Sequence, residues 1–343
     1  MQYILYVLLM LLVFGVMIFI HEFGHFITAR LCGVAVKEFA VGMGPKLFSW
    51  KSKKYDTKYG LRLLPIGGFV SMVGEDEESS DENAFCNKSV WKRMIIVGTG
   101  PVMNLLLGFL LMTILVFSLG NLSSTTVAKF TEGATSNQWL AVGDEITHVD
   151  GTRVHTGNEL VYEVMNKGHE PIDLRVIRNG EKITLEGVTF PGMEESGVSF
   201  GDYDFLVYAE EVNFPNLMKH AFWRSVSTVK MVYDSLIGLV TGRFGMEAVS
   251  GPVGVVEVVG EAAKTGFWNF LYIVIVLTIN LGVFNLIPFP ALDGGRFLFL
   301  IVEAIRKKPV SRNLESTINF VGIMILFGFM IFVTVKDVLH LFR

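Results

Sequence analysis

Two histidines and a glutamate near the N-terminus have the types and the spacing of a metal-binding motif. His21 and His25 are four residues apart, and Glu22 directly follows the first of them. On an α-helix, residues four apart project from one face, so the two imidazoles can grip one divalent ion with the glutamate beside it. In an H-E-x-x-H arrangement, neutral imidazoles bind Zn²⁺, the ion acidifies a bound water, and the glutamate accepts the proton of that water.

This motif stands at the end of an apolar segment. Residues 1–20 carry no charged side chain, and about 20 helical residues with a rise of about 1.5 Å each cross a bilayer core of about 30 Å. Ionisable groups at membrane depth are costly, which favours a functional role for His21, Glu22 and His25. One alternative stays open on this motif alone, since helix-spaced histidines can also hydrogen-bond to neighbouring helices.

A further acidic candidate follows much later in the chain. Residues 285–295 read NLIPFPALDGG, and a regular helix cannot pass through two prolines and two glycines. We therefore predict that the third apolar segment unwinds near Asp293. Non-helical backbone at membrane depth is tolerated where it lines a cavity, so Asp293 lies beside a polar pocket and can supply a third metal ligand. The alternative is a salt bridge between Asp293 and Arg296.

The composition is that of a membrane protein with an extramembrane part. Of the 343 residues, 51% are hydrophobic and 18% are charged, and the mean hydropathy is +0.48. The net charge of -4 shows no basic excess, so nothing indicates nucleic-acid binding. Cys32 and Cys86 are not spaced as metal ligands or as a redox pair, and we interpret them as reduced thiols that face the cytoplasm.

The hydropathy predicts a polytopic α-helical protein with four transmembrane helices. The predicted spans are residues 1–27, 95–119, 266–296 and, with the C-terminus, 317–343. Lysine and arginine are concentrated in residues 28–94 and 297–316, which places these two segments in the cytoplasm and residues 120–265 outside. The N-terminus lacks a basic region and a small-residue cleavage site, so the first helix is predicted to be retained.

The first cytoplasmic segment contains a predicted β-hairpin, about residues 58–74. Residues 61–73 form two β-prone apolar arms around a Gly-Gly turn. Such a hairpin is too short to span the membrane but can re-enter it from the cytoplasmic face, and its free edge can accept an extended peptide as an added strand. A hairpin that only packs against the helices is an equal alternative. The candidate substrate-binding residues are Gly67, Gly68, Phe69 and Val70. The acidic run that follows, residues 75–82, is predicted to be a solvated linker.

The extracytoplasmic part is predicted to contain a small α+β domain, residues 120–192. Strands are expected at residues 125–130, 145–149, 172–178 and 182–186, with a helix at residues 158–166. Gly143-Asp144-Glu145-Ile146 followed by Val149-Asp150-Gly151 resembles a PDZ pattern, for which peptide capture and steric gating are both open. Residues 193–265 are interpreted as a linker and an amphipathic helix, about residues 214–244, that lies on the outer leaflet.

Taken together, these motifs resemble those of the bacterial site-2 proteases, the intramembrane zinc metalloprotease family that includes the regulator of sigma-E protease. The matching segments are residues 21–25, 39–45, 65–68, 100–104, 251–252 and 285–295. The resemblance implies a metalloendopeptidase of the bacterial cytoplasmic membrane with one extracytoplasmic PDZ-like domain. It also implies an active site near the cytoplasmic face.

The resemblance implies roles for single residues as well. It makes His21, His25 and Asp293 the zinc ligands and Glu22 the catalytic base. The residues that it implies in shaping the substrate site are Asn285, Pro288 and Pro290. The implied substrates are single-span membrane proteins, such as anti-sigma factors or remnant signal peptides, cut within or near the span. A membrane zinc transporter and a non-catalytic membrane scaffold with a PDZ domain are the alternatives.

Overall fold

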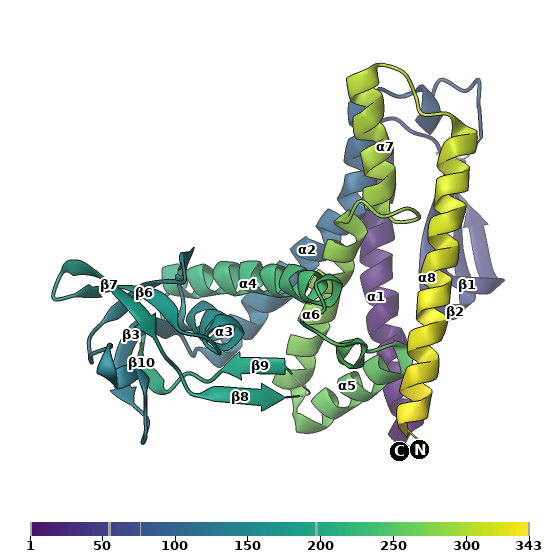
Figure 1. Cartoon of the computed structure of the whole chain (residues 1–343). Helices are drawn as coiled ribbons and strands as arrows, with labels where there is room; N and C mark the ends of the chain where they lie inside the picture. The colour runs from purple at the N-terminus through teal and green to yellow at the C-terminus, as the bar shows by residue number, and fades with distance from the viewer. Residues whose placement is uncertain (1, 54–55, 76, 196–197, 342–343) are drawn as a thin grey trace. The chain divides into compact units, whose positions relative to one another are not determined.

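The computed structural model describes residues 2–53, 56–75, 77–195 and 198–341. The chain forms two compact units, one of residues 1–108 with 250–343 and the other of residues 109–249 (Figure 1). Both predicted halves of the metal motif belong to the first unit.

The first unit is mainly helical. Its helices are α1 (Gln2–Leu31), α2 (Val90–Leu119), which runs on into the second unit, α5 (Pro252–Thr265), α6 (Phe267–Leu286), α7 (Asp293–Arg306) and α8 (Arg312–Leu341), with a 3-10 turn at Phe85–Asn87. Among the described helices, α1, α2, α6 and α8 are long and apolar enough to cross a membrane. These four helices coincide with the four predicted spans and confirm a multi-pass membrane protein.

The third predicted span is interrupted where its prolines and glycines predicted a break. α6 ends at Leu286 and α7 begins at Asp293. The loop between them folds back so closely that a Cβ on Gly294 would lie 2.1 Å from the carbonyl oxygen of Ile287. Only glycine fits at such an approach. The Gly-Gly pair after Asp293 therefore allows α7 to begin here and fixes Asp293 in its first turn.

Two long strands form the sheet of the first unit, β1 (Val36–Lys51) and β2 (Lys58–Met72). We predicted that the arms on either side of Gly67-Gly68 pair with each other, and this was wrong. Both arms pair with β1, because residues 68–72 and residues 58–61 each lie opposite the first half of that strand.

The bend of β1 explains this pairing. Gly42 and Gly44 adopt φ values of 86° and 84°, which lets β1 turn back after residue 41. The first half of β1 thereby offers both of its edges to β2, an arrangement that the pattern of β2 alone cannot reveal. Residues 68–72 become an outer strand, and β1 is the one strand with which they pair in the described part of the chain.

A buried carboxylate ties the last helix to α5. Asp337 Oδ2 on α8 accepts hydrogen bonds from the backbone N–H groups of Gly251 (2.8 Å) and Gly254 (2.9 Å). These N–H groups belong to the N-terminus of α5, where the helix itself supplies no acceptor and a negative charge is favourable. A Cβ on Gly251 would lie 2.9 Å from the same oxygen. Glycine is thus needed where α8 approaches.

The second unit is an α+β domain, as predicted. Its main sheet has the strand order β10-β3-β4-β6-β7, with β5 paired to β4. The elements are β3 (Ser123–Phe130), β4 (Glu145–Val149), β5 (Thr152–Arg153), α3 (Gly157–Lys167), β6 (Ile172–Arg178), β7 (Glu181–Val188) and β10 (Phe205–Ala209), with 3-10 turns at Ser136–Gln138 and Met246–Ala248. Fully buried Val127, Ile146, Leu160 and Leu174 lie in its core. All four predicted strands and the predicted helix are confirmed.

The sheet continues beyond the predicted boundary at residue 192. β8 (Gly192–Glu195) pairs with β9 (Val198–Gly201), and β10 pairs with β3 at the edge of the main sheet. The interpretation of this stretch as a linker was therefore wrong, and Phe205 of β10 is completely buried in the domain core. Strands of four or five residues carry too few alternations for the pattern to stand out.

The predicted amphipathic helix is α4 (Phe214–Val240). It packs on α3, where the Tyr162 hydroxyl donates to Asp234 at 2.7 Å and Lys230 pairs with Glu163. Burial and the Asp234 carboxylate raise the pKa of Tyr162, so the phenol stays a neutral donor. The charges that set α4 apart from a membrane span thus serve to attach it to α3.

A second face of α4 is apolar and exposed. The side chains on this face are Phe222, Val226, Tyr233, Ile237 and Val240. Their spacing of three, four or seven residues puts them in one stripe along the helix. The amphipathic pattern of α4 therefore arises from this exposed apolar face, which differs from the face that packs on α3.

Candidate metal centre

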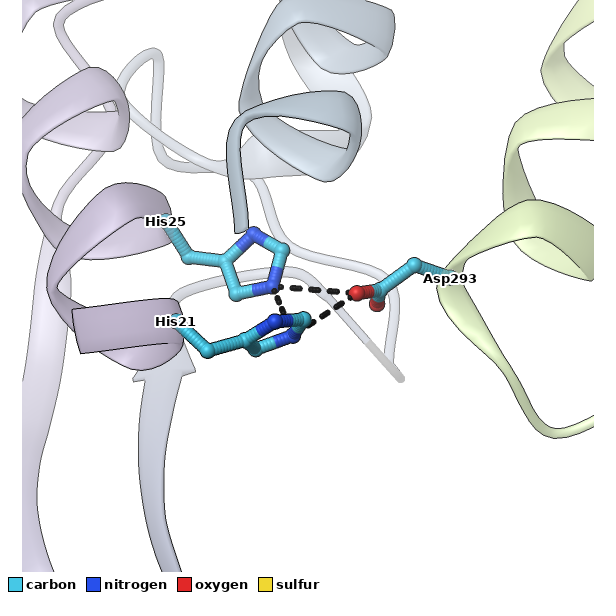
Figure 2. A group of neighbouring side chains, drawn as sticks. All are labelled: His21, His25 and Asp293. Carbon is cyan, nitrogen blue, oxygen red and sulfur yellow. Dashed lines mark hydrogen bonds and ion pairs between the residues drawn. The ribbon is translucent and has the colours of Figure 1, made fainter. Parts of the chain in front are cut away.

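Three potential metal ligands converge at one point of the first unit (Figure 2). The two histidine Nε2 atoms are 3.2 Å apart. Asp293 Oδ2 lies 2.9 Å from Nε2 of His21 and 3.3 Å from Nε2 of His25. Both histidines are buried, and Asp293 is half-buried. The structure thus brings together residues that lie almost 270 positions apart in the sequence.

Helix geometry places each of the three side chains. His21 and His25 lie one turn apart on α1, and Asp293 stands at the start of α7. Helix α2 contacts the far side of both imidazoles: His25 Nδ1 is 2.8 Å from the carbonyl oxygen of Ile96, and His21 Nδ1 is 3.3 Å from the side-chain Nδ2 of Asn104. The ring nitrogens that face α7 are therefore the Nε2 atoms.

Two glycines let α1 and α2 come close enough for these contacts. A Cβ on Gly24 of α1 would lie 2.8 Å from the carbonyl oxygen of Thr99 on α2. A Cβ on Gly100 would lie 2.3 Å from His25 Nε2 and 2.9 Å from His21 Nε2. The space that a side chain at residue 100 would fill is thus the space beside the two Nε2 atoms.

The donor set fits a zinc ion. Tetrahedral ligands that are each about 2.0–2.1 Å from zinc lie about 3.3 Å from one another, and the three distances here are 2.9, 3.2 and 3.3 Å. Asp293 Oδ2 is buried and makes no hydrogen bond, although both Nε2 atoms lie within 3.3 Å of it, and a cation shared by the three atoms would satisfy it. Two imidazoles and one carboxylate leave a fourth position for water or substrate.

Glu22 lies in the same cavity as the three ligand candidates. This cavity has a volume of about 200 Å³ and is lined by His21, Glu22, His25, Phe69, Val70, Met72, Glu75, Val97, Asp293 and Arg296. The Glu22 carboxylate lies close to the backbone of Val70. A Cβ on Gly68 would lie 3.5 Å from Glu22 Cγ. The outer strand of the sheet therefore forms the wall beside Glu22.

Glu75 and Arg296 form a second wall of this cavity. Glu75 Oε1 pairs with Arg296 at 2.6 Å, and its other oxygen accepts from the backbone N–H of Met72 at 3.1 Å. Both residues also line a neighbouring cavity of about 830 Å³. The interpretation of the acidic run as a solvated linker was wrong for Glu75, because Glu75 pairs with Arg296. This partner lies 221 positions away, so the local run of acidic residues does not reveal it.

The predicted substrate-site residues occupy different surroundings. Phe69 and Val70 line the cavity, and a Cβ on Gly67 would meet Met43 at 2.8 Å. Asn285 Nδ2 donates to the carbonyl oxygen of Leu281 in its own helix at 3.0 Å. A Cβ on Gly322 of α8 would lie 2.5 Å from Pro290, so Pro290 packs against that helix. Pro288 is exposed.

Comparison with known proteins identifies the family. The model of peptidase family M50 matches residues 9–329, which include both histidines and Asp293. The chain belongs to peptidase family M50. Its membership makes it a metalloprotease, and zinc is the metal in the names of its relatives.

Several relatives match this M50 peptidase over nearly its whole length. A candidate zinc metalloprotease of Clostridium perfringens is 34% identical over 339 residues, covering 98% of this chain and 99% of the relative. The zinc metalloprotease RasP of Oceanobacillus iheyensis is 31% identical over 427 residues, with 97% and 98% covered. The regulator of sigma-W protease RasP of Bacillus subtilis is 28% identical over 419 residues, with 98% and 99% covered. The resemblance to site-2 proteases is confirmed.

The close approach at Gly100 yields a test of the metal site. We expect Gly100→Ala to lower bound zinc from about one ion per chain to less than about a tenth of that, because the added methyl displaces the two Nε2 atoms. Gly98→Ala is the matched control on the same helix, where the nearest atom to the added Cβ is 3.4 Å away. Zinc is measured by elemental analysis of purified protein. Equal zinc contents in the two variants would contradict this account of the site.

Proposed function

We propose that this M50 peptidase cleaves single-span membrane proteins inside the membrane, with zinc held by His21, His25 and Asp293 and with Glu22 as the catalytic base. One observation carries the proposal. Three mutually close, buried ligand atoms and a glutamate line one cavity, and the histidines and Glu22 come from a helix able to span a membrane. Ionisable groups in such a helix are costly, so their presence there indicates a function.

The chemistry that follows is peptide-bond hydrolysis. When bound, zinc supplies a polarised carbonyl and a nucleophilic water at neutral pH. Glu22 accepts the proton that this water loses and passes it to the leaving amine. The Glu22 carboxylate lies on the side of the cavity formed by the outer strand, beside Gly68 and Val70. A zinc transporter and a non-catalytic scaffold have no use for a glutamate in this position.

A helical substrate must unwind before it can be cut. Its peptide carbonyls are paired within the helix, and exposing them without new partners would cost several kcal/mol each. We propose that residues 68–72 of β2 supply those partners by pairing with an extended substrate segment. The position of this strand supports the proposal, because it pairs with β1 on one edge and lines the cavity with Phe69, Val70 and Met72.

The name of a relative supports a proposal for the substrate class. A relative is named as a regulator of sigma-W protease, and anti-sigma factors with one span are accordingly the first substrates to consider for this chain. Remnant signal peptides are the second, since they too are single apolar helices. We propose no partner beyond such substrates and the lipid bilayer.

We further propose that the active site lies near the cytoplasmic face of a bacterial cytoplasmic membrane and that the domain of residues 120–192, extended by β10, is an extracytoplasmic PDZ-like domain. The lysines and arginines of residues 28–94 and 297–316 support this orientation. The exposed apolar stripe of α4 suits the surface of the outer leaflet. The sheet of residues 36–72 then belongs to the cytoplasmic side and re-enters the membrane beside the site.

The catalytic base is tested with Glu22→Gln. We expect this variant to keep its zinc, because Glu22 is not a ligand, and to lose at least about 99% of the cleavage of a tagged single-span substrate in liposomes. A chelator should abolish cleavage by the wild type, and added zinc should restore it. Cleavage by Glu22→Gln at the wild-type rate would contradict the role of the base. A wild type that binds zinc and transports it without cutting any substrate would favour the transporter.

Strand addition is tested by cross-linking in the Glu22→Gln background, with Cys32 and Cys86 replaced by serine. Single cysteines at Phe69 and Ser71 are paired with a cysteine scan of the substrate. We expect disulfides whose substrate positions differ by two residues between the two strand sites, because successive strand residues on one face are two apart. A cysteine at Phe48, on the part of β1 that lies opposite residue 61, is the control. A spacing of three or four residues would show a helical substrate and contradict strand addition.

The orientation is tested with the native cysteines. Both Cys32 and Cys86 are partly exposed free thiols. In intact cells, we expect a membrane-permeant maleimide to label them and an impermeant one to leave them unlabelled. A cysteine introduced at Thr131, in the second unit, should show the opposite behaviour toward the impermeant reagent. Labelling of the native cysteines by the impermeant maleimide in intact cells would contradict the proposed topology.

A further inference from the structure

Both imidazoles of the metal centre turn Nδ1 toward α2, but the two partners differ. His25 Nδ1 lies 2.8 Å from the carbonyl oxygen of Ile96. A carbonyl oxygen can only accept, so this Nδ1 carries the hydrogen and Nε2 has its lone pair free. For His25, the backbone of α2 therefore selects the tautomer that a metal ligand needs.

The partner of His21 is a side-chain amide, which can either donate or accept a hydrogen bond. His21 Nδ1 lies 3.3 Å from Nδ2 of Asn104. In this orientation the amide donates to Nδ1, which places the hydrogen of a neutral imidazole on Nε2, the atom that faces Asp293 at 2.9 Å. An Nε2 that carries a hydrogen has no lone pair for a metal.

The other end of the same amide lacks a partner. Asn104 is completely buried, and its Oδ1 is buried without a hydrogen bond. An amide turned by half a turn exchanges its oxygen and nitrogen with almost no change in shape. That turn would bring Oδ1 to His21 Nδ1 as an acceptor, in the same relation that Ile96 has to His25.

We infer that Asn104 is a positioning residue for the zinc site: in the loaded protein its Oδ1 accepts a hydrogen bond from His21 Nδ1–H and so keeps Nε2 of His21 available as a ligand. This inference rests on the proposed function, because it takes His21 to be a zinc ligand. A packing role alone would be met by leucine, which has nearly the same shape and no buried polar atoms to satisfy.

Zinc affinity of Asn104 variants tests the inference without any substrate. The zinc dissociation constant is measured by competition with a chromophoric chelator, and the visible absorption of the Co²⁺-loaded protein reports the ligand geometry. We expect Asn104→Leu to weaken zinc binding about 10- to 100-fold, the usual effect of losing such an outer hydrogen bond, and to change the Co²⁺ spectrum. Asn104→Asp, whose carboxylate only accepts, should bind zinc as tightly as the wild type or more tightly.

Asn280→Leu is the matched control, because Asn280 on α6 also has a buried Oδ1 without a hydrogen bond and lies outside the metal centre. We expect its zinc affinity to equal that of the wild type. Wild-type affinity in Asn104→Leu would reduce Asn104 to packing. A loss in Asn104→Asp as large as that in Asn104→Leu would show that the amide donates, and would overturn the inference. If Asn104→Leu fails to fold, the Asp variant still tests the direction of the hydrogen bond, because an amide that must donate to His21 Nδ1 predicts weaker zinc binding in Asn104→Asp. A wild type without zinc would instead overturn the proposed function itself.

Discussion

The site depends on how closely α2 approaches α1. Two buried imidazoles need partners for both nitrogens of each ring, because burial separates them from bulk water. Helix α2 meets that need from one side with Ile96 and Asn104, and Asp293 faces the other side. The approach is possible because Gly24 and Gly100 have no Cβ at the contact. A side chain at either position would separate the histidines from their partners.

The break between α6 and α7 sets where Asp293, the candidate acidic ligand, stands relative to the two histidines. In an uninterrupted apolar helix, the depth of a carboxylate in the membrane would be set only by its position along that helix. The loop of residues 287–292 instead starts a new helix at Asp293, and the tight contact of Gly294 with Ile287 fixes where that helix begins. The prolines end one helix, and the glycines allow the next to start within a few residues.

What could be predicted from the sequence was whatever depends on local pattern. The spacing of His21 and His25, the proline-glycine break before Asp293 and the alternating strands of the second unit are local signals. The pairing of both arms of β2 with β1, the contact of Glu75 with Arg296 and the place of Asn104 beside His21 are not. Each depends on a partner that is 20 to more than 200 positions away, and residue types such as a glutamate in an acidic run look the same with or without that partner.

The outer strand, residues 68–72, which we propose to pair with substrate, already has a hydrogen-bond partner on its free edge. The N–H of Met72 donates to a carboxylate oxygen of Glu75 at 3.1 Å. Glu75 is in turn held by Arg296. A carboxylate oxygen thus occupies one donor that a substrate backbone would use. A substrate segment must compete with Glu75 for Met72, and the ion pair with Arg296 gives Glu75 an alternative partner when it is displaced. The strand can therefore accept a peptide, as we propose, without leaving the N–H of Met72 unpaired in either state.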